Sequence, residues 1–260
     1  MSVHDVAATG FEAEADAYER ARPSYPPDAV AWLGDALRIA PGSTVVDLAA
    51  GTGKFTRLLT GTGAQLVAIE PVDGMRALLR HTQPDVATLS AVAEALPLRG
   101  GSVDAIVVAQ AFHWFDAERA LAELQRVLRP GGRLGLIWNA RDRSEPWVDA
   151  IWSIMDRVEK RAPWRAHDKF GASTEAIGSP RFTPVTAATF HHEHVVTRDE
   201  MVDRVRSVSH VAVLPPAARE AVLDEVREVL ATDPATAGKT ELAVPYRVDA
   251  YWAERLKPRR

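Results

Sequence analysis

The clearest chemical signal in this sequence is a turn of small residues between positions 45 and 56. The segment reads VVDLAAGTGKFT and contains Asp47, Ala49, Gly51 and Gly53. Small residues let a backbone approach a ligand closely, and the helix that follows offers free N–H groups at its N-terminus. Alone, this turn predicts a nucleotide-like ligand at the end of the first strand. A tight strand–helix turn without a ligand is the alternative.

Polar side chains follow later apolar runs at similar places. Glu70 ends the second run, 17 residues after Gly53, where a carboxylate can accept both hydroxyls of a ribose. The segment AEALP, from Ala93 to Pro97, follows the third run and can frame an adenine. Gln110 and His113 follow the fourth run, at the crevice where the strand order of such folds reverses.

These residues belong to a regular alternation of elements. Apolar strands are predicted at 44–49, 66–70, 86–90, 103–109 and 133–139, and helices at 54–60, 74–81 and 117–128, with a turn at 129–132. Continuous apolar strands separated by helices are typical of a parallel sheet covered on both faces. With right-handed crossovers they predict an α/β, doubly wound three-layer sandwich.

Composition narrows the possible functions. The chain has 260 residues, no cysteine and a formal net charge of -4. The lack of cysteine excludes disulfides, thiolate nucleophiles, cysteine-bound zinc and iron–sulfur clusters. The net charge favours a small-molecule partner over nucleic acid. No apolar run reaches the length of a membrane span, and the N-terminus has no signal-peptide core, so we expect a cytoplasmic protein.

Five motifs in order resemble those of class I S-adenosylmethionine (SAM)-dependent methyltransferases of the type-11, ubiquinone-biosynthesis-like group. They are VVDLAAGTGKFT, AIEPVDGM, AVAEALPL, SVDAIVVAQAFHWF and LRPGGRLGLIWN. The resemblance covers residues 41–140. It implies a Rossmann-like, mostly parallel seven-stranded sheet with an antiparallel last strand, and an additional helical insertion.

The resemblance also implies a SAM site, with S-adenosyl-L-homocysteine as the product. The methionine part would be surrounded by Asp47, Ala49, Gly51 and Gly53 and lined at its end by Gln110. The nucleoside would be held by Glu70 on the ribose and by Pro71, Met75, Ala93 and Glu94 around the adenine. Many relatives have glycine in place of Ala49, whose methyl group is tolerated if its backbone is not left-handed.

Four segments are expected from this reading. Residues 1–40 form an N-terminal helical lid, 41–140 the SAM-binding core, 141–183 a helical insertion over the acceptor site, and 184–260 the strands and helices that complete the core. The segment from Ala15 to Pro26 resembles a pattern of one branch of these enzymes. There Tyr18 or Arg22 would touch the cofactor; an ordinary capping helix is the alternative.

Methyl transfer from a sulfonium is an in-line displacement that needs no metal, and no metal site is expected. His113 is the candidate general base, and a packing histidine is the alternative. Trp147, Trp152 and Trp164 would wall a small organic acceptor, although Trp147 also fits a core stripe. Arg141 and Arg143 suit either an anionic acceptor or a solvated surface. The tract HHEH at 191–194 spreads its side chains over two faces of a strand, which disfavours a metal.

Two other functions stay open at this stage. An NAD(P)-dependent oxidoreductase would use the same turn and Glu70, but Thr56 stands where its third glycine would be. A non-catalytic SAM-binding regulator would keep the cofactor residues alone. Among methyltransferases we expect a small-molecule acceptor, with O-methylation ahead of C- or N-methylation, and a monomer or homodimer without nucleic-acid or membrane partners.

Overall fold

The computed structural model describes residues 22–161, 177 and 180–256, and its contacts divide the chain into two compact units. The sheet unit comprises Tyr25–Asn139, His167–Phe190 and Val248–Arg260, and the helical unit comprises Met1–Ser24, Ala140–Ala166 and His191–Arg247. Each unit is described by itself. The prediction of four segments along the chain stays a prediction.

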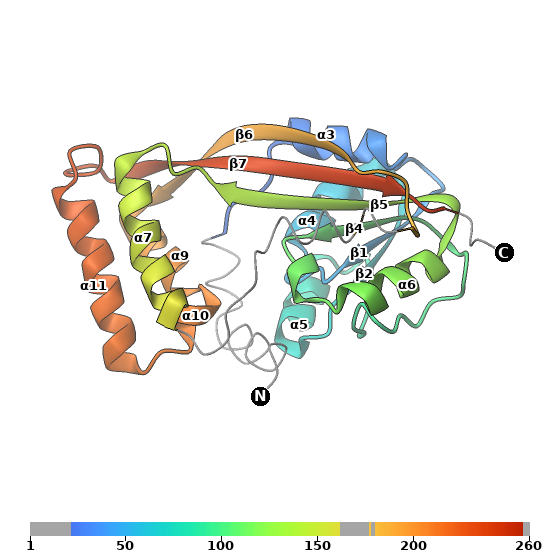
Figure 1. Ribbon diagram of the computed structural model, residues 1–260, viewed down its shortest axis with the longest axis horizontal. Coiled ribbons are helices and arrows are strands. Elements are labelled where there is room, and N and C mark those ends of the chain that lie inside the picture. Colours follow the sequence, from blue (N-terminus) through green and yellow to red (C-terminus); the bar gives the residue numbers. More distant parts are fainter. Residues whose placement is uncertain (1–21, 162–176, 178–179, 257–260) are drawn as a thin grey trace. The chain divides into compact units, whose positions relative to one another are not determined.

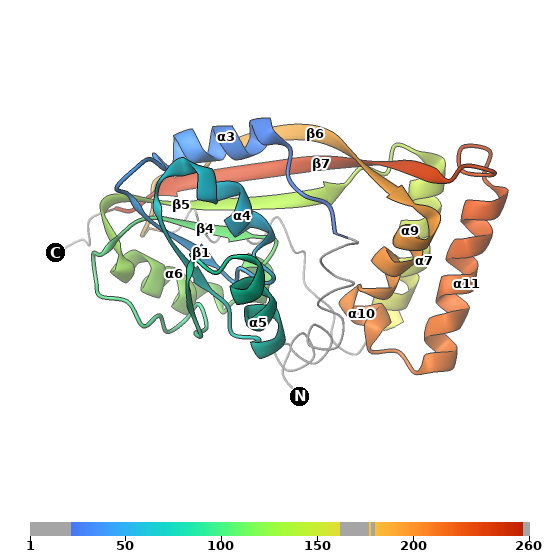
Figure 2. The ribbon, with the colours of Figure 1, turned by 180° about the vertical axis from the view of Figure 1, so that it is seen from behind.

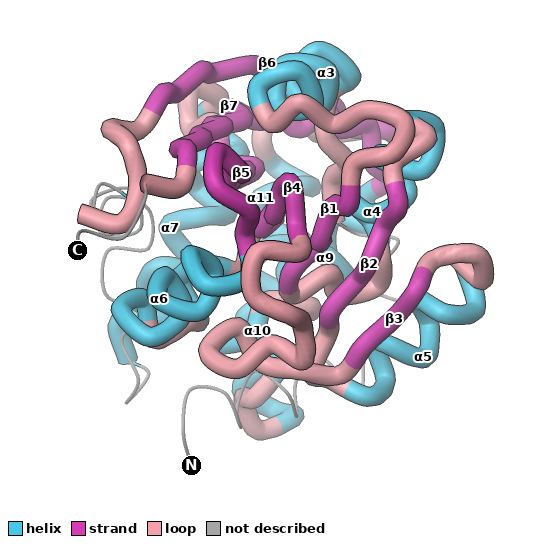
Figure 3. The backbone as a smooth tube through the Cα atoms, turned by 90° about the vertical axis from the view of Figure 1, so that its right-hand side faces the viewer, coloured by secondary structure: helices cyan, strands magenta, loops and turns pink. Residues whose placement is uncertain are grey.

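One sheet of seven strands has the order β3-β2-β1-β4-β5-β7-β6 (Figure 3). The strands are β1 Thr44–Leu48, β2 Gln65–Ile69, β3 Ala87–Leu89, β4 Val103–Ala109, β5 Leu128–Arg141, β6 Thr186–Thr197 and β7 Glu241–Glu254. The first five pair in parallel, and β7 is antiparallel. This confirms the predicted Rossmann-like sheet.

Helices cover both faces of the sheet because alternate strand residues point to opposite sides. On one face, Val46, Leu48 and Ile106 pack with α6 (Ala117–Val127). On the other, Val45, Ala105 and Val107 pack with α3 (Pro27–Ala36) and α4 (Lys54–Leu59). The two ribbon views show these helices on opposite sides (Figures 1 and 2).

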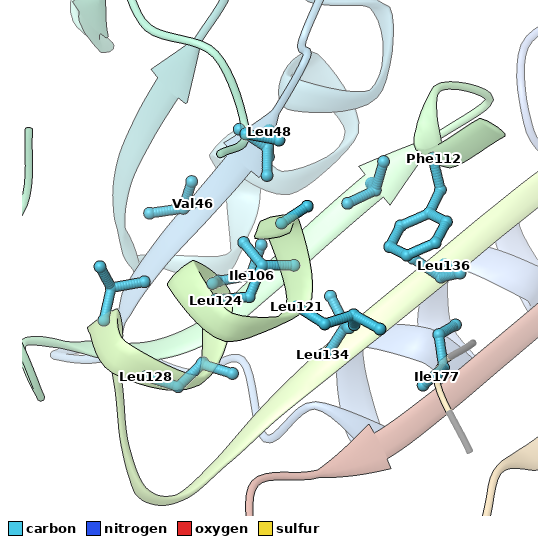
Figure 4. Close-up of a cluster of buried hydrophobic side chains, with 14 of the residues drawn as sticks. Val46, Leu48, Ile106, Phe112, Leu121, Leu124, Leu128, Leu134, Leu136 and Ile177 are labelled. Atoms are coloured by element: carbon cyan, nitrogen blue, oxygen red, sulfur yellow. The ribbon is translucent and has the colours of Figure 1, made fainter. Parts of the chain in front are cut away.

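The α6 face forms a dense apolar cluster. Leu121 and Leu124 of α6 lie over Ile106 and Leu134 of the strands (Figure 4). Both leucines recur at the spacing of one helix face, as the sequence pattern predicts. Further helices of the unit are α5 Asp73–Thr82 and the short 3-10 helices η1 Thr60–Thr62 and η2 Phe112–Trp114.

The prediction of a turn at 129–132 that precedes the fifth strand is wrong, because these residues lie inside β5. Leu128 pairs with Val103 and Arg133 with Ala105, so the register shifts between the two pairs. The extra residues form an irregularity rather than the end of the strand. Gly132 is packed tightly there, since an added Cβ would lie 2.9 Å from the carbonyl oxygen of Arg129.

The helical unit has its own apolar core. Its helices are α7 Pro146–Arg161, α9 Arg198–Arg206, α10 Ser209–Ala212 and α11 Pro216–Thr232. The core includes Ile151, Trp152, Val205, Leu223 and Tyr246. α7 falls within the segment 141–183, for which helix is expected, and α9, α10 and α11 fall within the segment 184–260, for which both strands and helices are expected. Across the described residues, no helix is both long and apolar enough to cross a membrane.

Candidate functional site

Three adjacent parallel strands bring the predicted polar residues to one edge of the sheet. Asp47 is the fourth residue of β1, Glu70 directly follows β2, and Gln110 directly follows β4. Since β1 lies between β2 and β4, the carboxyl ends of all three strands are neighbours. Residues separated along the chain by up to 63 positions thus meet within the sheet unit.

Asp47 is a buried carboxyl group with one oxygen unpaired. Its Oδ2 accepts a hydrogen bond of 2.6 Å from the Thr56 hydroxyl, while its buried Oδ1 has no partner in the described structure. Burial raises the pKa of Asp47 to about 7; the Thr56 hydrogen bond lowers it and the charge of Glu70 raises it further. A desolvated carboxylate is costly unless a cation or donor meets it. The geometry therefore suits a ligand with a positively charged or donor group.

Thr56 was missed by the sequence analysis as a site residue. Asp47 shares its strand face with Val45, the face that α4 covers, and Thr56 is the third residue of α4. The sequence signal that could have indicated this role is the position of Thr56, three residues after Gly53 in the first turn of the helix. At the sequence level Thr56 served only as evidence against the third glycine of a dinucleotide-binding motif.

Glu70 ties the small-residue turn to the end of β2. Its Oε2 accepts the N–H of Gly51 and its Oε1 accepts the N–H of Val72, each at 2.8 Å. Burial raises the pKa of Glu70, against the opposing effects of these two hydrogen bonds and of Arg76. Each carboxylate oxygen can accept more than one hydrogen bond. The group can therefore hold the turn and still accept ligand hydroxyls.

The turn itself has an unusual backbone. Ala49, Gly51 and Gly53 have φ angles of 57°, 58° and 84°, all left-handed. Gly53 cannot easily be replaced, because an added Cβ would lie 3.0 Å from Leu79. Ala49 does not meet the condition stated for its tolerance, since its backbone is left-handed. A non-glycine residue there costs roughly 1–2 kcal/mol.

Gln110 has a left-handed backbone as well, with a φ of 63°. Its N–H donates to the Ile137 carbonyl at 3.0 Å, and its side-chain Nε2 lies 3.5 Å from the Asn139 carbonyl oxygen. Such strain is kept only where surrounding contacts fix it, and it clusters at binding sites. The strained positions of this chain thus include the ends of β1 and β4.

The other predicted cofactor residues, Pro71, Met75, Ala93 and Glu94, differ in their burial and their contacts. Met75 is buried, and an added Cβ at Gly51 would lie 3.6 Å from its sulfur. Pro71 is exposed, and Ala93 is buried. Glu94 accepts the N–H of Asp116, the N-cap residue of α6, at 2.7 Å, so one of its oxygens helps to position that helix.

The remaining candidates are His113, Arg22, Tyr18 and Trp164. His113 lies in η2, partly buried, with its ring centroid 4.8 Å from that of Trp114. Arg22 belongs to the helical unit, where it donates to the Ser207 carbonyl at 3.4 Å. Tyr18 and Trp164 lie outside the described residues.

Two aromatic candidates are core residues of the helical unit. Trp147 and Trp152 are both buried in its apolar cluster. No group of three potential metal ligands occurs among the residues that the structure describes.

Comparisons with known proteins point to one family. The profile of a methyltransferase domain matches residues 46–136. An uncharacterised methyltransferase of Mycobacterium tuberculosis is 41% identical over 91% of this chain and 91% of its own length. An uncharacterised methyltransferase-like protein of Schizosaccharomyces pombe is 33% identical over 94% of this chain and 95% of its own.

A solved structure agrees with these sequences. A putative type II methyltransferase from Anaeromyxobacter dehalogenans superposes with a TM-score of 0.61 and 27% identity. The match covers 90% of this chain and 96% of that one. The shared region therefore extends well beyond the motif-bearing residues.

The backbone strain at Ala49 is testable. We expect Ala49→Gly to raise the free energy of unfolding by about 1 kcal/mol, because glycine adopts the left-handed region without strain. Ala50 has a negative φ, so Ala50→Gly should instead lower it by about 0.4–1 kcal/mol. Urea unfolding of both variants measures the difference, and equal effects in the same direction would contradict it.

The raised pKa of Asp47 predicts a pH-dependent stability. Between the unfolded value of 3.8 and the folded value of about 7, the folded state binds the extra proton. Stability should therefore fall as pH rises through this window, by about 4 kcal/mol in total.

Asp47→Asn should remove this fall, because asparagine does not ionise. The exposed Asp35→Asn is the matched control and should keep it. Urea unfolding between pH 4 and 8 gives the comparison, and identical profiles for the Asp47→Asn and wild-type proteins would refute the assignment.

Proposed function

Because the chain belongs to the class I SAM-dependent methyltransferases with a type-11 domain, we propose that it transfers the methyl group of SAM to a small organic acceptor by in-line displacement. The observation that supports this most is the buried Asp47 carboxylate beside Glu70, with an oxygen left for a positively charged group. Membership of a methyltransferase family argues against the alternative of an NAD(P)-dependent oxidoreductase. It also favours an enzyme over a non-catalytic regulator.

The residues at the sheet edge fit the chemical groups of SAM. We propose that Asp47 holds a positive charge of its methionine part and that Glu70 accepts its ribose hydroxyls. The turn from Ala49 to Gly53 has no side chain larger than that of Thr52, so its backbone can approach the ligand closely. Gln110 lines the methionine end, and Pro71, Met75, Ala93 and Glu94 surround the adenine.

Methyl transfer from SAM needs little acid–base catalysis by the protein. SAM supplies a methyl group on a sulfonium that already carries the activation. The chain's contribution is to align the reactants and exclude water, which can lower the barrier by about 7–11 kcal/mol. The imidazole of His113 would accept a proton from an acceptor hydroxyl or amine. A carboxylate acceptor would have no proton to give up.

On the basis of the sequence pattern, we propose that the segment 141–183 determines which acceptor is bound. We also propose that the N-terminal segment 1–40, with Tyr18 and Arg22, covers the cofactor.

Calorimetric titration tests the cofactor site. We expect SAM and S-adenosylhomocysteine to bind with micromolar affinity and NADH and NADPH not to bind. Asp47→Asn should weaken SAM at least about tenfold, because it removes a charge-assisted contact. Asp35→Asn should bind normally. Binding of a nicotinamide cofactor, or unchanged SAM affinity in Asp47→Asn, would contradict the proposed site.

Substitution of His113 tests the proposed base. With an acceptor that carries a proton, His113→Ala should lower kcat by about 10²–10⁴-fold and leave SAM affinity unchanged. His81→Ala, an exposed histidine of α5, is the control. Product S-adenosylhomocysteine is measured at saturating acceptor from a small-molecule screen. Unaltered turnover would remove His113 from the mechanism.

A further inference from the structure

Two arginines of the helical unit lie over the ring of one tryptophan. Arg141 ends β5, Arg204 lies in α9, and Trp152 lies in α7. The guanidinium carbons of Arg141 and Arg204 lie 4.2 Å and 5.6 Å from the ring centroid of Trp152. Cation–π contact fixes each guanidinium against the ring but leaves its N–H groups to be satisfied by other partners.

These donors lack acceptors in the described part of the chain. Arg204 is only 5% exposed, and its buried Nε and Nη1 have no hydrogen-bond partner. The Trp152 side chain is fully buried, and its Nε1 has no partner either. Arg141 takes part in no hydrogen bond or ion pair that involves the described residues.

Neighbouring arginines contrast with this pair. Arg143, two residues beyond Arg141, binds Asp149, Asp156 and the Ser153 hydroxyl. Arg157 binds Glu225. The ion pairs of Asp149, Asp156 and Glu225 are thus made with exposed arginines and not with Arg141 or Arg204.

The lowered pKa of Arg141 agrees with a positive charge that is buried without a close counter-ion. Burial, and next the charge of Arg204, lower the pKa of Arg141 to about 10. Tyr246, Asp156 and Glu159 oppose this change through longer-range interactions. Two like charges buried near each other are unfavourable unless an anion offsets them.

We propose that Arg141 and Arg204, both held over the ring of Trp152, form a binding site for a small oxyanion, a carboxylate or a phosphate. Guanidinium groups present paired donors that match the oxygens of both anions. The donors already exist in the folded unit, so binding needs no new side chain. Arg141, Trp152 and Arg204 all belong to the helical unit, and none of them is among the residues proposed to hold SAM.

Thermal unfolding and calorimetry of the full chain test this inference. Sodium succinate and inorganic phosphate are the probes, with sodium chloride at matched ionic strength and neutral succinamide as controls. We expect at least one oxyanion to raise the melting temperature of the wild type, since a ligand that binds the folded state stabilises it. Succinamide and chloride should not.

Substitutions then locate the site. Arg204→Met and Arg141→Met should each weaken the bound anion at least about tenfold, and Arg204→Met should remain folded because it replaces an unpaired buried charge by an apolar side chain. Arg143→Met, next to the site but already paired in the native chain, should respond like the wild type. No oxyanion effect on the wild type, or equal effects in all three variants, would overturn the inference.

Incubation with SAM distinguishes two sources of the anion. If the bound carboxylate is the methyl acceptor, mass spectrometry will find its methyl ester, formed as the carboxylate oxygen bonds to the methyl carbon and the sulfur–methyl bond breaks. If it is a separate ligand, it will be recovered unchanged. Either result supports the site, and binding is measured without SAM, so failure of methyl transfer leaves it intact.

Discussion

The site of the sheet unit depends on one constraint, the burial of an ionisable carboxyl group at the end of a central strand. Asp47 is enclosed by β1, by α4 and by the turn that joins them, and within the described structure its carboxyl group is hydrogen-bonded by Thr56. Burial of the charged form of this carboxyl group costs free energy, which is why the pKa of Asp47 rises to about 7. The same group gains most when a positively charged ligand arrives, so instability without ligand and affinity for it have one origin.

Backbone strain follows from the same arrangement. The chain must leave β1 and enter α4 within five residues, and it does so with left-handed backbone at Ala49, Gly51 and Gly53. Glu70 fixes this turn by accepting the Gly51 N–H, so one carboxylate links β2 to the turn after β1. In the proposed SAM site, this contact would hold the turn before α4 in place ahead of binding, which lowers the cost of binding.

The two units treat buried charge in opposite ways. The sheet unit buries carboxylates and suits a cationic ligand, whereas the helical unit buries the guanidinium of Arg204 and suits an anion. In each case a side chain on a regular element is held by a neighbour that does not neutralise it, Thr56 for Asp47 and Trp152 for the two arginines. Buried charge without a counter-ion in the described structure is therefore the observation that both proposed sites share.

The sequence by itself determined the fold class, the family and the residues at the ends of β1, β2 and β4, because strand periodicity and turn composition are local properties. It also placed the helices to within a few residues. Only the tertiary structure decided that Ala49 is left-handed, that residues 129–132 continue a strand, that Thr56 serves Asp47 and that Arg204 meets Arg141 on Trp152. Those facts depend on which distant residues come into contact and on how far each is removed from water, and no local pattern records either.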